Sequence, residues 1–196
     1  MQLNRTRLGA NHEPVRVSEL EDLARLVKGL NDIGREISAL TTRPSIMGNV
    51  GEFIASRIFG IDLHRAANNA GSDGQFRYGS LGGKSVNIKW YARLETLDIN
   101  PAAVPDTYLV LSGPRAGPTT KKHIRPWVIT HVYLFDAPAL HAELKARGVK
   151  LQVGTSLLRA QWDRAEVYPE ACNLMYTLSD DQRSALALFG SAGVGA

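Results

Sequence analysis

Apolar side chains recur at helical spacing near the start of the chain. Leucine, valine and isoleucine occupy every third or fourth position from Leu20 to Leu40, which predicts an amphipathic helix over residues 18–40. Ser18 and Glu21 stand three residues apart at its start, the pattern of a capping box. The apolar stripe fits two partners: the protein's own sheet, which we expect first, or a second copy of the chain in a homodimer.

A second helix and a series of strands follow. The segment GNVGEFIASRIF predicts a helix that starts near Ser45 and ends at Gly60, because glycine commonly terminates helices. Short strands are expected in IDLHRA, at 107–113 and at 127–135, and the strongly apolar TYLVLSG should be central. Residues 74–92 predict a β-hairpin whose strands, GQFRY and SVNIKWYA, are joined by GSLGG.

The remaining pattern completes an α/β arrangement. APALHAELKARG predicts a helix after the last of these strands, and SDDQRSALALF predicts a capped helix that begins at Ser179. The order of elements predicts an α/β single domain with a mixed central β-sheet flanked by helices. We expect this domain to span residues 18–190, between a flexible lead-in at 1–17 and a mobile tail at 191–196.

Composition narrows the class of protein. The chain has 196 residues, of which 44% are hydrophobic and 21% charged, ordinary values for a globular protein with a sizeable core. Its one cysteine, Cys172, excludes an intramolecular disulfide and suits a reducing, cytoplasmic location. We expect no membrane partner, because no apolar run approaches the length that spans a bilayer. The net charge of +4 permits nucleic-acid binding through phosphate contacts.

The hairpin carries the residues with the most informative chemistry. Asp73 stands at the start of the first strand, and Asn87 and Lys89 lie on the second. Because side chains alternate along a strand, Asn87 and Lys89 share one face, which faces the same side as Asp73 if the register allows it. An acid, an amide and a lysine are then gathered on one small surface. The opposite face carries Val86, Ile88 and Trp90.

This arrangement resembles the active-site core of the PD-(D/E)XK nuclease superfamily, which has a restriction-endonuclease-like fold. That superfamily has an aspartate on one strand, a (D/E)-X-K triplet on the next, and often a glutamate on a preceding helix. Here GNVGE at 48–52 supplies the glutamate, and the resemblance covers residues 45–112. It implies that Glu52 and Asp73 bind Mg²⁺ or Mn²⁺ and that Lys89 positions or activates the attacking water.

One position departs from that pattern. Asn87 stands where the superfamily usually has an acid, and an amide oxygen can bind magnesium but brings no negative charge. We therefore expect one metal ion, with Asn87 completing its shell, and a Mg²⁺-dependent endonuclease that cleaves DNA. One alternative is a catalytically weakened or inactive relative that binds DNA or a protein partner. Another is a small α/β protein with no nucleic-acid role.

Each site residue also has a common structural role. Asp73 can cap its own turn, Lys89 can be an exposed strand lysine, and Glu52 can be a solvated residue near the positive end of a helix. Taken singly, these roles are the more frequent ones. The coincidence of all of them with the GxxGE helix favours the nuclease-like site.

Basic residues near the hairpin are candidates for DNA contacts. Arg93 follows Trp90 and Tyr91 closely, and arginine with aromatic rings can clasp nucleic acid. Trp90 itself is expected in the core. The loop at 113–126 is basic and has no acid, so it can contact phosphate, although a solvated loop would carry the same charges. Its basic residues are Arg115, Lys121, Lys122 and Arg125.

Overall fold

A computed structural model describes residues 17–65, 71–94, 96–114 and 126–190. It divides into two compact units, residues 1–44 and residues 45–196. Helix α1, Val17–Thr41, belongs to the first unit and is one residue longer at each end than predicted. The expected tail and all but the last residue of the expected lead-in lie outside the described residues. That α1 and the sheet unit form one domain stays a prediction.

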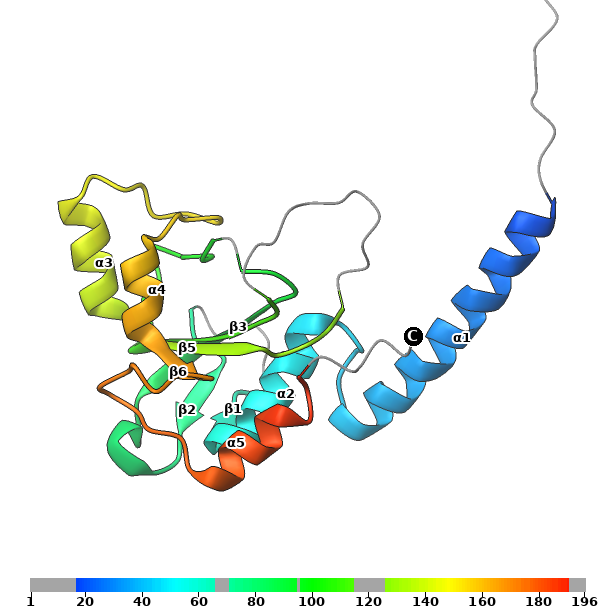
Figure 1. Ribbon diagram of the computed structural model, residues 1–196, viewed down its shortest axis with the longest axis horizontal. Helices are drawn as coiled ribbons and strands as arrows, with labels where there is room; N and C mark the ends of the chain where they lie inside the picture. Colours follow the sequence, from blue (N-terminus) through cyan, green and yellow to red (C-terminus); the bar gives the residue numbers. More distant parts are fainter. Residues whose placement is uncertain (1–16, 66–70, 95, 115–125, 191–196) are drawn as a thin grey trace, which may run out of the picture. The chain divides into compact units, whose positions relative to one another are not determined.

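The second unit is built on a mixed sheet whose six strands follow chain order (Figure 1). Strands β3 and β4 are parallel, and all other neighbouring pairs are antiparallel. β4 is buried along its whole length between β3 and β5, as the apolar TYLVLSG segment predicts. The strands are β1 (Ile61–Leu63), β2 (Gly74–Phe76), β3 (Ser85–Tyr91), β4 (Thr107–Ser112), β5 (His131–Asp136) and β6 (Glu166–Tyr168).

Helices cover both faces of this sheet, so the predicted α/β class with a mixed, helix-flanked sheet is confirmed. One apolar cluster joins one face of the sheet to α2 and to the C-terminal segment that contains α5. A second cluster joins the other face to α3 and α4 (Figure 1). The four helices are α2 (Met47–Phe59), α3 (Ala137–Ala146), α4 (Arg159–Ala165) and α5 (Asp180–Ala187).

Local signals end and begin the elements where the sequence predicts. α2 ends at Gly60, whose φ of 64° lies in the left-handed region that glycine adopts without strain. α5 begins after Ser179, and Ser179 and Gln182 form a reciprocal capping box. The predicted hairpin is present, with Gly74 opposite Val86 and a short 3₁₀ turn, Gly79–Leu81, in its connection.

Other predictions need correction. The strand expected over 127–135 begins only at His131, because backbone groups before it form hydrogen bonds outside the β-sheet. The carbonyl of Val128 accepts a hydrogen bond from the Trp90 indole, and the amide of Ile129 donates to the carbonyl of Phe189. Neither α4 nor β6 was expected. They are only seven and three residues long, and packing rather than periodicity defines them.

A buried polar pair connects strand β4 to helix α3. The Tyr108 hydroxyl and His141 Nε2 are 2.9 Å apart, and the two rings stack with their centroids 5.9 Å apart. Burial raises the pKa of Tyr108 to about 12. Burial, followed by repulsion from Lys145, lowers the pKa of His141 below its ordinary value of 6.5. His141 is therefore neutral in the folded chain at neutral pH.

This pair predicts a loss of stability in mild acid. Below pH 6.5 the unfolded chain protonates His141 while the folded chain resists, so stabilisation present above that pH disappears as the pH falls through the lowered pKa. The free energy of unfolding should fall by at most about 1.4 kcal/mol per pH unit from this group. Denaturant unfolding between pH 7 and pH 5 checks it. His141→Phe should flatten the slope, and an unchanged slope in that variant contradicts the assignment.

Candidate active site

Strand β3 presents different chemistry on its two faces. Val86, Ile88 and Trp90 are buried in the cluster that includes α2. Asn87 and Lys89 alternate with them and are half-buried on the other face. The alternation predicted from SVNIKWY is confirmed.

Asp73 is tied to β3 by its side chain. It directly precedes β2, and its Oδ2 accepts a hydrogen bond of 2.6 Å from the amide of Ile88. Its own amide donates to the carbonyl of Val86 at 2.8 Å. The β2–β3 ladder ends with Gly74 opposite Val86, so the carboxylate replaces the missing strand partner of Ile88. Asp73 thus caps the backbone of the neighbouring strand.

Asp73 lies beside the segment of β3 that carries Asn87 and Lys89. The β2–β3 ladder ends with Gly74 opposite Val86, and Asp73 directly precedes Gly74. The carboxylate is held at the amide of Ile88, the residue between Asn87 and Lys89. That the acid, amide and lysine side chains meet on one surface stays a prediction.

Asn87 carries an unusual buried oxygen. Its Oδ1 is shielded from solvent and has no hydrogen-bond partner in the described part of the protein. A buried carbonyl oxygen without a donor is unfavourable by about 1–3 kcal/mol, and such groups in folded proteins call for an explanation. A cation or an ordered water bound to this oxygen would satisfy it.

Glu52 lies on α2, the helix that packs against the other face of β3. The preceding residue, Gly51, faces the Trp90 ring so closely that an added Cβ would lie 3.0 Å from Trp90 Cβ. This glycine lets α2 pack tightly on β3, and Glu52 follows it as a half-buried residue. Because α2 covers the face opposite Asn87 and Lys89, the convergence of Glu52 with those two residues stays a prediction.

The ligands available for a metal ion are oxygen atoms. Within the described ranges, no group of three or more His, Cys, Asp or Glu side chains is placed to hold a metal. Asp73 and Asn87 still offer hard oxygen donors of the kind that Mg²⁺ prefers. The Asp73 carboxylate has about four lone-pair sites, and one of them accepts the amide of Ile88. These residues fit an ion that keeps several waters.

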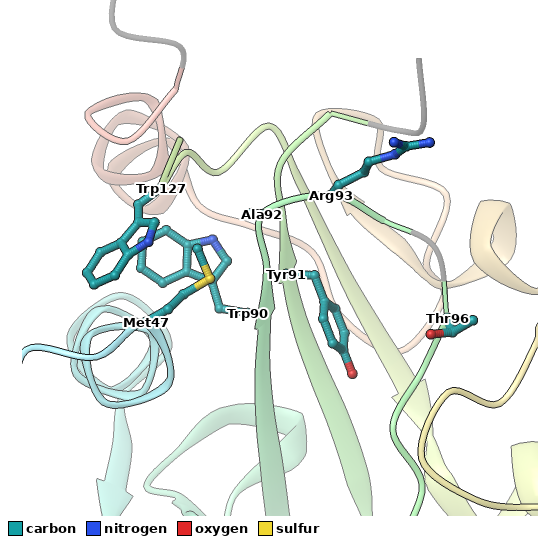
Figure 2. A pocket seen from close by; sticks show the side chains of 7 residues that line it. All are labelled: Met47, Trp90, Tyr91, Ala92, Arg93, Thr96 and Trp127. Carbon is teal, nitrogen blue, oxygen red and sulfur yellow. The ribbon is translucent and has the colours of Figure 1, made fainter. Parts of the chain in front are cut away.

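A pocket of about 430 Å³ lies at the end of β3 (Figure 2). The Trp90 indole donates a hydrogen bond of 3.2 Å to the carbonyl of Val128. The rings of Trp90 and Trp127 meet edge to face, with their centroids 5.9 Å apart. The lining residues are Met47, Trp90, Tyr91, Ala92, Arg93, Thr96 and Trp127.

The polar side of this pocket is formed by Tyr91 and Arg93. The Tyr91 hydroxyl accepts a hydrogen bond of 2.9 Å from the amide of Asp98. Burial raises the pKa of Tyr91 well above its usual range, so the hydroxyl stays protonated and cannot act as a base. Arg93, predicted to contact DNA, lines the pocket, whereas the other predicted contacts lie outside the described residues: Arg115, Lys121, Lys122 and Arg125.

Sequence reasoning missed part of this pocket. Trp127 was assigned to a strand, and Met47 and Thr96 were not singled out. Trp127 directly follows the basic segment 113–126, and its 42% exposure is high for a tryptophan. An aromatic residue beside a run of basic residues was the available signal. Trp90, in contrast, is buried as expected.

Replacing Asp73 should separate its structural and chemical roles. Asp73→Ala leaves the amide of the buried Ile88 without its acceptor, so the free energy of unfolding should fall by about 1–3 kcal/mol. Asp73→Asn keeps an acceptor oxygen and should retain most of the stability. Denaturant unfolding measures both, with Gln75→Ala on the exposed side of β2 as control. Equal stability of Asp73→Ala and the natural protein would contradict the proposed hydrogen bond.

Comparison of the sequence with protein-family models and with curated proteins finds no match in either case.

Proposed function

We propose that the protein is a Mg²⁺-dependent phosphodiesterase that cleaves DNA through a site on strand β3. One observation supports this most directly. The Asp73 carboxylate accepts a hydrogen bond from the amide of Ile88, the residue between Lys89 and Asn87, whose buried Oδ1 has no hydrogen-bond partner among the described residues. This grouping has the order of residues that resembles the PD-(D/E)XK pattern.

The residues divide the chemistry between them. Asp73 and Asn87 would hold the cation through oxygen atoms, and Glu52 is a further candidate ligand. When bound, Mg²⁺ or Mn²⁺ lowers the pKa of a coordinated water and neutralises charge on the phosphate. The ammonium group of Lys89 would orient the attacking water and stabilise negative charge that develops on the phosphate oxygens.

The pocket at the end of β3 supports a nucleic-acid substrate. Arg93 offers a guanidinium group for a phosphate, and Trp127 offers an exposed indole on which a base could stack. Arg93 comes two residues after β3, the strand that carries Lys89. Trp127 packs against Trp90 of the same strand. The net charge of +4 favours association with a polyanion.

The chemistry of Asn87 also favours a second candidate function. An amide in place of an acid lowers the negative charge of the site by one and weakens its hold on a cation. The protein can then be a relative that binds DNA or a protein partner without cutting. Salt-sensitive DNA binding with no metal-dependent cleavage would distinguish it.

Cleavage assays test the proposal. Supercoiled and linear DNA incubated with Mg²⁺ or Mn²⁺ should be cut by the natural protein. Asp73→Asn and Lys89→Ala should each lower the rate of DNA cleavage by at least about a hundredfold. Asp73 is proposed to bind the cation, and Lys89 is proposed to orient the attacking water. Rates are measured from gel-resolved time courses.

Matched controls guard against trivial effects. Lys84→Ala removes an exposed lysine from the same hairpin and should leave the rate unchanged. Unfolding curves must show that the variants are folded. Cutting that survives in both Asp73→Asn and Lys89→Ala would contradict the assigned site, and a folded natural protein that does not cut would contradict the phosphodiesterase.

A further inference from the structure

Helix α1 carries a long row of exposed apolar side chains. Seven leucine, valine and isoleucine residues on this one helix are between 45% and 76% exposed. They are Leu20, Leu23, Leu26, Val27, Leu30, Ile33 and Leu40. Soluble proteins rarely leave so large a continuous apolar patch uncovered, and such patches mark interaction surfaces.

The spacing of the row indicates what kind of surface covers it. Leu23, Leu30 and Ile37 recur every seven residues, and so do Leu26, Ile33 and Leu40. These two sets are the a and d positions of three heptads. A repeat of 3.5 residues keeps the seam facing another helix along its whole length, as in a coiled coil.

No charged side chain stands at an a or d position of these three heptads. Arg25 pairs with Asp22 at 3.4 Å, and Arg35 pairs with Asp32 in the same helix. At the positions that flank the a and d residues, Asp22 and Glu36 are the charged side chains, and both are acidic. Two glycines, Gly29 and Gly34, also flank the seam and permit close approach of a second helix. A fitting partner is therefore apolar and helical.

We propose that the partner is a second copy of this chain, paired through α1. The seam of one α1 has the composition that the seam of the other requires, and a two-fold arrangement places the same patch on both partners. The exposed parts of seven large side chains, of the order of 100 Å² of apolar surface each, approach the roughly 800 Å² that each partner contributes to a stable interface.

The sheet unit offers no matching apolar row among its described residues. Its exposed large apolar side chains lie outside the helices and strands, each on a connecting or terminal segment. They are Ile46, Tyr78, Val104, Trp127, Val153, Leu158, Leu174 and Leu188. These scattered side chains form no heptad row of the kind that the seam of a second α1 provides.

Sedimentation analysis and light scattering of the full chain test the proposal. The natural protein should have twice its 21.4 kDa chain mass at micromolar concentration. Leu30→Glu places a charge in the seam and should weaken the dimer by about tenfold or more. Asn31→Glu adds the same charge one residue further on, outside the seam, and should leave the mass unchanged. Two differently tagged copies should also co-purify, and Leu30→Glu should abolish this.

Two outcomes would overturn the proposal. The first is a natural protein that has the mass of one chain throughout the concentration range. A thermal midpoint that falls in Leu30→Glu but not in Asn31→Glu would then show that the stripe packs on its own sheet. The second is a Leu30→Glu variant that keeps its helical circular dichroism and remains dimeric.

Discussion

The alternation of side chains along strand β3 is the constraint on which the rest of the site depends. Val86, Ile88 and Trp90 are buried with α2, which fixes the strand against the core. The same alternation then directs Asn87 and Lys89 to the other face. A shift of one residue would bury the lysine and expose the apolar residues, so packing selects this register strongly.

The hydrogen bond between Asp73 and Ile88 links this packing to chemistry. It completes the edge of the β2–β3 ladder and holds the carboxylate at the amide of Ile88, the residue after Asn87. One interaction thus serves both stability and the proposed cation site. The side chain of Asp73, directly before β2, extends the contact with β3 beyond the first residue of this short strand.

Sequence patterns predicted the elements whose local signals agree with their packing. Gly60 ends α2, and the apolar TYLVLSG forms the central strand. Elements that tertiary contacts define were not predicted. Strand β6 is only three residues long, too short for a periodic pattern. Near it, the side-chain amide of Asn173 donates hydrogen bonds to the carbonyls of Leu134 and Ala165, a contact between distant segments. For the site, strand periodicity predicted which side chains share a face. It could not predict the bond from Ile88 to Asp73 or the contact of Trp127 with Trp90, which join distant segments.

The central claim is that Asp73 and Asn87 form a cation site, and titration calorimetry with Mn²⁺ tests it most directly. The natural protein should bind one Mn²⁺, and Asp73→Asn should abolish binding while the protein stays folded. Asn87→Asp supplies the missing charge next to the ion and should tighten binding by about tenfold or more. The claim is contradicted if the natural protein and both variants bind Mn²⁺ equally, or if none of them binds it.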